Sequence, residues 1–288
     1  MQCGLSAAPF RAHISGVNCV WCNGEFVEGP LAVSASDRGL THGLGIFETL
    51  LARDGRPVVL EMHLERMRNG AERLGWRTEG LHSTLIEEAI RGLLEKRDLK
   101  HGRARVRIAL SAGEGSLQEL ARGENSLLWI VASRAPEAPE AVAMITASFP
   151  RNEASPLAGI KCASYAENLV ALDHARRNGA EEALFYNTKG ELCEGTTSNL
   201  FLVKNGEVFT PPLSSGCLPG TTRARVIAKC RELGITVVEA PLSVRDLEQA
   251  SEVFSTSATR GVVPVRRIDR RDYETSGRIS AKLRSEVQ

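Results

Sequence analysis

A proline-spaced segment near the middle of the chain most constrains how the chain can fold. Residues 134–140 read Arg-Ala-Pro-Glu-Ala-Pro-Glu, and proline offers no backbone N–H to a helix or a sheet. The chain has 288 residues, which at about 100 to 200 residues per domain suggests two domains. We therefore expect a smaller domain over residues 17–133, a linker over 134–140 and a larger domain over 141–288.

The first half is predicted to combine strands with two helices. Asn23-Gly24 and Asp54-Gly55 are typical of hairpin turns, because these residues tolerate the left-handed backbone that such turns need. Thr84 and Glu87 have the spacing of a helix capping box. The expected helices are 61–76 and 83–96, and the expected strands are 17–22, 25–27, 43–50, 56–60, 103–111 and 126–133.

The second half alternates strands with helices, which gives the whole chain a mixed α/β character. One predicted helix follows Lys161, where Tyr165, Leu169, Leu172 and either Ala175 or Arg176 fall on a single stripe. The other expected helices are 221–233 and 244–250, and the expected strands are 142–148, 183–186, 199–203, 208–210, 235–239, 252–255 and 262–268.

Composition excludes several classes of function. A net charge of +1 leaves no basic excess to neutralise a nucleic-acid backbone. No apolar run is long enough to span a membrane, and the first residues lack the apolar core of a signal peptide. With 42% hydrophobic and 25% charged residues, the sequence is typical of a soluble globular protein, for which the cytoplasm is the expected location.

The seven cysteines do not form a recognisable framework. They are odd in number and scattered, which predicts reduced thiols. Cys19 and Cys22 form one C-x-x-C pair, for which a redox or zinc half-site is the alternative interpretation. Since no second pair and no histidine cluster accompany them, we predict no metal site.

Lys161 is the candidate reactive group of the chain. It follows the turn-prone stretch 155–159 and precedes a predicted helix, whose positive end would disfavour the ammonium form. Burial would act in the same direction, and a neutral amine is what a Schiff base with an aldehyde requires. The alternative is an ordinary solvated lysine, which is the commoner role of a lone lysine before a helix.

Several ordered motifs resemble those of the class IV aminotransferases, which are pyridoxal-phosphate (PLP) enzymes of fold type IV. The family comprises branched-chain aminotransferases, D-amino-acid aminotransferases and aminodeoxychorismate lyases. The resemblance covers about residues 20 to 269 and implies the two-domain, mixed α/β (α+β) fold of D-amino-acid aminotransferase. The motifs are His63-x-x-Arg66, Lys161-x-x-x-Tyr165-x-x-Asn168, Glu194-Gly-Thr-Thr-Ser-Asn199 and Leu218-Pro-Gly-Thr-Thr-Arg223.

The resemblance assigns four residues to the cofactor ring. Lys161 would bond to PLP as a Schiff base (an aldimine) and then move the substrate proton, which makes it the catalytic residue. Glu194 would face the ring nitrogen and keep it protonated. Tyr165 would hydrogen-bond the phenolic oxygen, and Leu218 would lie against the ring. The alternative role for Tyr165 is that of an aromatic side chain in the core.

A second group of residues would bind the PLP phosphate. Arg66 has the bidentate geometry that suits a phosphate dianion, although an ordinary surface ion pair is the alternative. Thr221 and Thr222 open a predicted helix, where a backbone N–H and a hydroxyl can bind an anion; a simple N-cap is the alternative. In the last loop, Ser257 would supply a hydroxyl to the phosphate, with Thr259 as the alternative. Ala258 stands where relatives often carry a hydroxyl, so only a backbone contact to cofactor or substrate is expected there.

The resemblance implies an enzyme that transfers an amino group between an amino acid, possibly branched-chain, and a 2-oxo acid. Arg107 is similar to an arginine that lines the substrate pocket of branched-chain enzymes, but a solvated arginine row on 103–107 is the alternative. An aminodeoxychorismate lyase, which forms 4-aminobenzoate and pyruvate, remains a second interpretation, and a non-catalytic PLP-binding protein a third. A homodimer is implied, whereas the substrate and its L or D configuration stay open.

Overall fold

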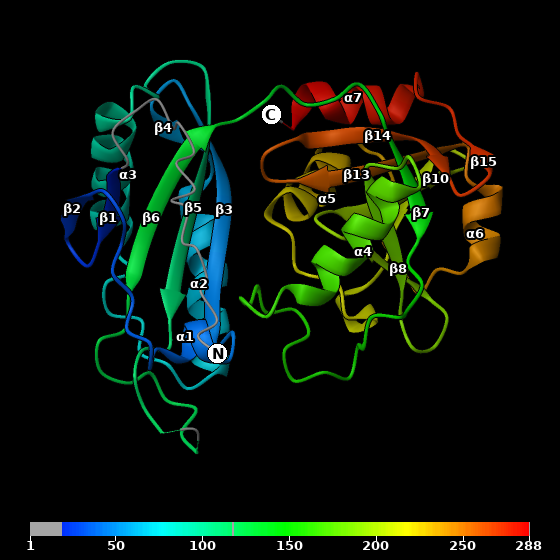
Figure 1. The fold of residues 1–288 in the computed structure, drawn as a ribbon. Helices are drawn as coiled ribbons and strands as arrows, with labels where there is room; N and C mark the ends of the chain where they lie inside the picture. The colour runs from blue at the N-terminus through cyan, green and yellow to red at the C-terminus, as the bar shows by residue number, and fades with distance from the viewer. Residues whose placement is uncertain (1–18, 117, 288) are drawn as a thin grey trace, which may run out of the picture.

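Two β-sheets, each drawn from one half of the chain, organise the molecule (Figure 1). The computed structural model describes residues 19–116 and 118–287. The first sheet has six strands in the order β2-β1-β6-β5-β3-β4. Its elements are β1 (Cys19–Cys22), β2 (Glu25–Glu28), α1 (Arg38–Thr41), β3 (Gly45–Arg53), β4 (Arg56–Pro57), α2 (Leu60–Arg73), α3 (Ser83–Lys96), β5 (Arg103–Ser111) and β6 (Leu128–Arg134).

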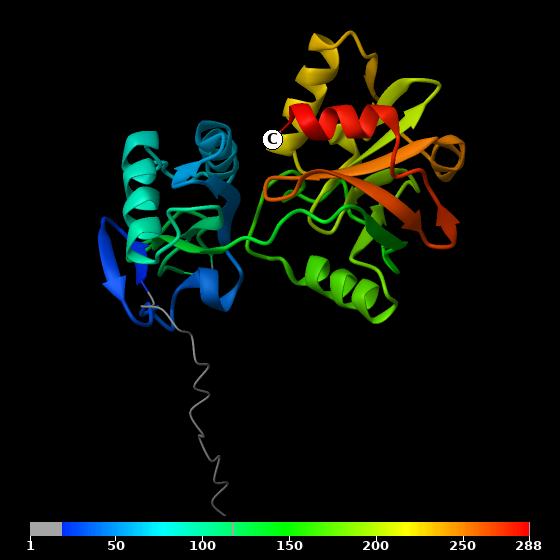
Figure 2. The ribbon, with the colours of Figure 1, turned by 90° about the horizontal axis from the view of Figure 1, so that it is seen from above.

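The second sheet has nine strands in the order β12-β11-β10-β13-β14-β7-β8-β9, with β15 paired to β14. Figure 2 shows the two sheets as bodies side by side, joined by the chain drawn in green. The elements of the second half are β7 (Val142–Thr146), α4 (Ala166–Arg177), β8 (Glu182–Tyr186), β9 (Leu192–Gly195), β10 (Asn199–Lys204), β11 (Glu207–Thr210), η1 (Leu213–Ser215), α5 (Thr221–Glu232), β12 (Val237–Glu239), α6 (Val244–Gln249), β13 (Glu252–Ser257), β14 (Gly261–Ile268), β15 (Arg271–Asp272) and α7 (Arg278–Glu286).

The first sheet has one apolar face and one charged face, as strand β5 shows. Ala104, Val106 and Ile108 point to one face and are buried beneath α2 and α3, since side chains alternate along a strand. The arginines at 103, 105 and 107 therefore point to the opposite face, towards the second half of the chain. This sheet uses its apolar face for the core and its arginine face for the space between the two halves.

The second sheet is covered by helices packed against different strands. Helix α5 contacts β13 and α7 contacts β14, around the stacked rings of Phe201 and Phe254, whose centroids are 4.9 Å apart. Helix α4 packs on β8 through Ala171 and Ala175, which meet Phe185. Small side chains on α4 let the helix approach the sheet closely.

Several predicted elements agree with the structure and others are wrong. Helix 83–96 and strand 103–111 have the predicted bounds. The predicted strand 56–60 stops at Pro57, because Val59 adopts a left-handed backbone (φ 47°) from which α2 begins at Leu60. The capping box at Thr84 and Glu87 does not form: α3 begins at Ser83 after His82, without a side-chain cap. The part of strand 17–22 before Cys19 lies outside the described residues.

The stripe predicted for the helix after Lys161 is wrong at Leu169, although Ala175 is buried as predicted. Helix α4 begins at Ala166 and buries Asn168 together with the two alanines above, whereas Leu169 is 58% exposed. Periodicity alone favoured the leucines, but close packing on β8 selects the smaller side chains. Strands β9 and β15 and helix α7 carried no sequence signal that we recognised.

Burial of α2 predicts a clear difference between two leucine substitutions. Leu64→Ala should lower the free energy of unfolding by about 2 to 5 kcal/mol, because it leaves a cavity where the side chain is fully buried. Leu169→Ala, at the exposed position on α4, should change it by less than about 0.5 kcal/mol. Urea unfolding followed by circular dichroism measures both, and equal losses would contradict the packing described.

Candidate active site

A cavity of about 1390 Å³ lies between the two sheets, and all ten predicted site residues line it. They come from α2, β5, the segment before α4, β9, the segment between η1 and α5, the start of α5, and the end of β13 with the turn that follows it. The ten residues are Arg66, Arg107, Lys161, Tyr165, Glu194, Leu218, Thr221, Thr222, Ser257 and Ala258. Tertiary structure thus brings together residues that span most of the sequence.

Lys161 lies on a segment that pairs with β3 through an isolated β-bridge between Cys162 and Ile46. The Phe47 N–H donates to the Lys161 carbonyl at 2.9 Å, and the Ala163 N–H donates to the Gly45 carbonyl at 2.7 Å. The close approach needs glycine at position 43, which has φ +64° and where a Cβ would come within 2.9 Å of the Ser164 hydroxyl. Glycine at position 43 therefore leaves room for the segment that carries Lys161.

The environment of Lys161 favours the neutral amine. Burial and the charge of Arg66 lower the pKa of Lys161 to about 8, against the opposing carboxylates of Glu48 and Glu194. Its Nζ lies 4.6 Å from the centroid of the Phe47 ring. Since α4 begins only at Ala166, the predicted contribution of a helix starting directly after the lysine is wrong, and burial takes its place.

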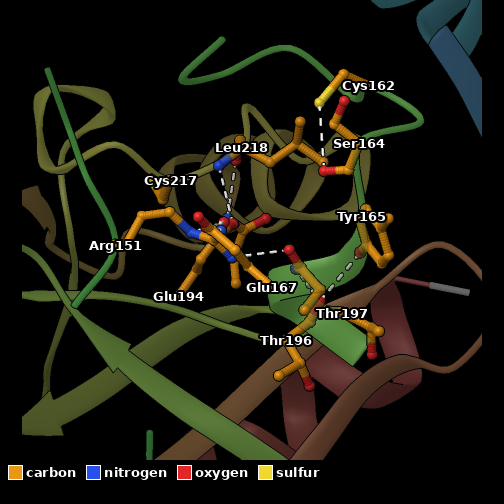
Figure 3. A network of polar contacts seen from close by, with 12 residues as sticks. Arg151, Cys162, Ser164, Tyr165, Glu167, Glu194, Thr196, Thr197, Cys217 and Leu218 are labelled. Carbon is orange, nitrogen blue, oxygen red and sulfur yellow. Dashed lines mark hydrogen bonds and ion pairs between the residues drawn. The ribbon is translucent and has the colours of Figure 1, made fainter. Parts of the chain in front are cut away.

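Glu194 is held by a backbone donor and by an arginine (Figure 3). Its Oε2 accepts the Leu218 N–H at 2.9 Å, and its Oε1 lies 3.7 Å from Nε of Arg151. Burial raises the pKa of Glu194, and the charge of Arg151 opposes that rise. The Arg151 guanidinium stacks 4.1 Å from the centroid of Phe185, while its Nε is buried without a hydrogen-bond partner.

Hydrogen bonds fix the turn after Glu194 from two sides, and Figure 3 shows the side formed by Tyr165. On one side, the Tyr165 hydroxyl and the Asn168 amide both donate to the Thr196 carbonyl, at 3.0 and 2.7 Å. On the other side, buried Glu182 accepts the Thr197 N–H at 2.6 Å. Burial, with the negative charges of Glu194 and Glu182, raises the pKa of Tyr165 to about 12. The tyrosine is therefore a neutral hydroxyl at neutral pH.

The start of α5 has the features of an anion site. Gly220 precedes Thr221 and Thr222, and a Cβ at Gly220 would meet Oδ1 of Asn199 at 2.0 Å, so no larger residue fits there without a shift. The first N–H groups of a helix have no partner within the helix. Arg66 reaches the same place, because its Nη1 donates to the Pro219 carbonyl at 3.0 Å.

A buried network joins this anion site to the first sheet. Arg66 donates to both carboxylate oxygens of Glu48, at 2.8 and 2.5 Å. His63 joins Glu48 through Nδ1 at 2.6 Å and Thr221 through Nε2 at 3.3 Å. Burial alone would raise the pKa of Glu48, but the Arg66 charge and the hydrogen bonds from His63 and Arg66 lower it to about 2. The carboxylate is therefore ionised at any physiological pH.

The remaining predicted residues, Arg107, Ser257 and Ala258, also line the cavity. The Arg107 guanidinium lies 3.8 Å from the Phe47 ring centroid. Ser257 accepts a hydrogen bond from Arg260 at 3.2 Å, and Ala258 follows it in the turn between β13 and β14. The buried hydroxyl of Thr256, one residue earlier, lines the cavity and has no hydrogen-bond partner.

Sequence reasoning missed four polar residues that hold the site together: Glu48, His63, Arg151 and Glu182. His63 stands inside the His63-x-x-Arg66 motif, but its second partner, Thr221, lies 158 residues further along the chain. A charge within an apolar strand, as for Glu48 in β3 and Glu182 in β8, was the available signal, since buried carboxylates need partners.

Three further observations concern the cysteine pair, metal ions and membrane spans. Cys19 and Cys22 both lie in β1, three residues apart, so their side chains point to opposite faces of the strand. Within residues 19–116 and 118–287, no group of three or more His, Cys, Asp or Glu side chains is placed to hold a metal ion. No helix in the described part of the chain is long and apolar enough to cross a membrane.

The site defines a class of enzyme. A buried amine of lowered pKa, a buried carboxylate and a helix start suited to an anion surround one cavity, which is what a phosphorylated aldehyde cofactor requires.

Comparison with known proteins identifies the family. The family model for amino-transferase class IV matches residues 45–268. The Escherichia coli branched-chain-amino-acid aminotransferase is 30% identical over 262 residues, covering 87% of this chain and 84% of that enzyme. The Bacillus subtilis aminodeoxychorismate lyase is 29% identical over 270 residues, covering 92% of each. A solved Brucella abortus aminotransferase bound to PLP is 30% identical, with a TM-score of 0.82 and coverage of 93% of this chain and 96% of that one.

Because the family model spans most of its length, the chain belongs to the class IV aminotransferases. It is an enzyme of that PLP-dependent family and has its mixed α/β fold. These findings confirm the resemblance, the fold class and the class of activity that the sequence predicted.

The lowered pKa of Lys161 predicts its reactivity. In the folded protein without added cofactor, acetylation of Lys161 by acetic anhydride should rise with a midpoint near pH 8, and in the urea-unfolded chain near the ordinary 10.5. Between these values the unfolded chain binds more protons, so the stability of the fold should rise with pH, and Lys161→Met should remove that rise. Peptide mass spectrometry measures the acetylation, and equal midpoints in both states would contradict the environment described.

Proposed function

We propose that the chain binds PLP in the cavity between its sheets and transfers an amino group from an amino acid to a 2-oxo acid. The observation that carries the proposal is Lys161, a buried amine whose pKa of about 8 lies near working pH. Membership of a PLP-dependent family and the PLP-bound Brucella abortus relative support the choice of cofactor.

The residues around the cavity suit each part of PLP. Lys161 offers the amine for the aldehyde, and Glu194 offers a carboxylate for the ring nitrogen. Thr221 and Thr222, with Arg66 beside them, offer donors for the phosphate. The buried, unpartnered hydroxyl of Thr256 adds a polar group to the same lining. When bound, PLP supplies an electron sink for the negative charge that develops on the substrate α-carbon.

The chain's own groups then have defined tasks. Lys161 Nζ would accept the proton from the substrate α-carbon and later donate a proton back to the substrate. A pKa of about 8 lets the amine be either neutral or protonated near neutral pH. Glu194, held by the Leu218 N–H and facing Arg151, would orient and keep the proton on the ring nitrogen. Arg107 would bind a substrate carboxylate in the cavity.

The second candidate activity is that of an aminodeoxychorismate lyase. It is favoured by the Bacillus subtilis lyase, which this chain matches at 29% identity over 92% of its length. Both activities need the same lysine, so the substrate that the cavity admits would decide between them.

Product analysis distinguishes the two activities. The protein with PLP should convert one class of amino acid into its 2-oxo acid while a second 2-oxo acid gains the amino group. A panel of L-amino acids, D-amino acids and aminodeoxychorismate, followed by absorption spectra and product chromatography, would identify the donor. Pyruvate and 4-aminobenzoate from aminodeoxychorismate, without transamination, would instead establish the lyase. Lys161→Ala should abolish either turnover and keep most phosphate-driven binding, and full turnover in that variant would refute the site.

Substitution of Arg107 tests the substrate end of the cavity. Arg107→Ala should raise KM for the amino acid by about ten-fold or more, because it removes a charged donor to a carboxylate. Arg177→Ala is the matched control, since that side chain is 77% exposed on α4. Steady-state kinetics measure both variants. An unchanged KM in Arg107→Ala would show that Arg107 does not bind the substrate.

We further propose a homodimer and a cytoplasmic location, as the family resemblance and the composition suggest, together with domains divided at residues 134–140. Light scattering on the active protein tests the oligomeric state. A fully active monomer would overturn the proposed dimer.

A further inference from the structure

Asn168 on α4 is a buried polar residue of the cavity to which the proposed function gives no task. It is 8% exposed and lines the cavity together with Tyr165. Its Oδ1 accepts a hydrogen bond from Nη2 of Arg151 at 3.1 Å, and its Nδ2 donates to the Thr196 carbonyl at 2.7 Å. A guanidinium can only donate and a carbonyl can only accept, so these two partners fix the orientation of the amide.

The carbonyl of Thr196 is shared between two donors. Besides the amide of Asn168, it accepts the hydroxyl of Tyr165 at 3.0 Å. Thr196 is buried, and the N–H of the same peptide group, that of Thr197, donates to Glu182 at 2.6 Å. The peptide group is therefore held in place, and its carbonyl cannot turn towards another donor.

The hydroxyl of Tyr165 has a single proton, so it donates one hydrogen bond at a time. Its ring is held edge-on against Phe47, with the two centroids 5.4 Å apart. Rotation about the C–O bond can therefore redirect the proton while the ring stays in place. In the structure this proton is donated to Thr196, and it must be released before Tyr165 can donate to a bound molecule.

The position of Tyr165 relative to Lys161 indicates which group of PLP it would meet. The phenolic oxygen of PLP is attached to the ring carbon next to the one that bears the aldehyde. Since the aldehyde would lie at Lys161, the phenolic oxygen would lie close to the same lysine. The Nζ atom of Lys161 is 5.5 Å from the centroid of the Tyr165 ring, so the tyrosine is on hand for that oxygen.

We propose that Asn168 is a positioning residue: it keeps the Thr196 carbonyl hydrogen-bonded, so that Tyr165 can turn its proton to the phenolic oxygen of bound PLP. The inference rests on the proposed function, in which PLP occupies this cavity. Without the Asn168 amide, the same rotation would leave a buried carbonyl unsatisfied, and the proton of Tyr165 would stay with Thr196.

The test compares PLP with 3-deoxypyridoxal 5′-phosphate, which lacks the phenolic oxygen. The ratio of the Kd of the deoxy compound to the Kd of PLP, both measured by spectroscopic titration, gives the contribution of that oxygen to binding. A general loss of structure weakens the binding of both compounds and leaves the ratio unchanged. The effect of the phenolic oxygen on the aldehyde within PLP itself is the same for every variant, so it cancels when ratios are compared.

Two substitutions remove the donor to Thr196 and differ in what they leave for Arg151. Asn168→Leu has a similar size and no polar atom, whereas Asn168→Asp retains an acceptor for the guanidinium. Both should lower the ratio by about ten-fold, because the Tyr165 proton is then no longer available to PLP. A ratio that falls in only one of the two variants, or in neither, would overturn the inference.

Control variants separate this role from others. Tyr165→Phe should lower the ratio to the same extent, and combining it with Asn168→Asp should lower it no further, because both changes act on one proton. A further fall in the double variant would contradict the inference. Asn178→Asp, at an exposed position directly after α4, should leave the ratio unchanged. Absence of saturable PLP binding in the unchanged protein would instead overturn the proposed function.

A crystal structure of the PLP complex gives a second measurement, which needs no substitution. Nδ2 of Asn168 should remain within about 3.2 Å of the Thr196 carbonyl oxygen, with the Tyr165 hydroxyl in hydrogen-bond contact with the phenolic oxygen. An amide that has left the carbonyl, or a hydroxyl out of reach of the phenolic oxygen, would contradict the proposal even if the variants fail to fold.

Discussion

The pairing of the Lys161 segment with β3 is the interaction on which the site depends. Strand β4 pairs only with Ala52 and Arg53, which leaves the beginning of β3 with a free edge. The chain returns from the second half to that edge, where Cys162 bridges to Ile46. Backbone hydrogen bonds at this edge place an amine from the second half against an aromatic ring from the first. The cavity between the sheets follows from this contact.

Around that cavity, charges are buried in compensating pairs. Glu48 is fully buried and ionised because Arg66 and His63 donate to it, and Glu182 accepts from the turn after Glu194. An isolated buried charge would be costly, whereas a paired and hydrogen-bonded one can hold a loop in place. Lys161 is the exception, because burial lowers its pKa towards working pH. Glu48 therefore stays ionised near neutral pH, whereas Lys161 can gain or lose a proton there.

Much of the fold could be predicted because its signals are local. The hairpin turns, helix 83–96 and strand 103–111 follow from periodicity and turn chemistry within a few residues of each other. The errors came where packing competes with local preference. Helix α4 buries alanines in place of leucines because β8 leaves little room, and Val59 takes a left-handed backbone that ends β4 early.

By itself, the sequence determined the chemical groups of the site and their order along the chain. The lysine, the carboxylate, the helix start and the arginines are ordered motifs, and their residue types limit the chemistry available. Only the tertiary structure decided that these groups share one cavity and that Glu48 binds Arg66 and His63 together. It also decided that burial, rather than a helix end, lowers the pKa of Lys161. The physical reason is that hydrogen bonds, burial and charge act through space, between residues that are 15 positions apart, as for His63 and Glu48, or 153, as for Arg66 and Pro219.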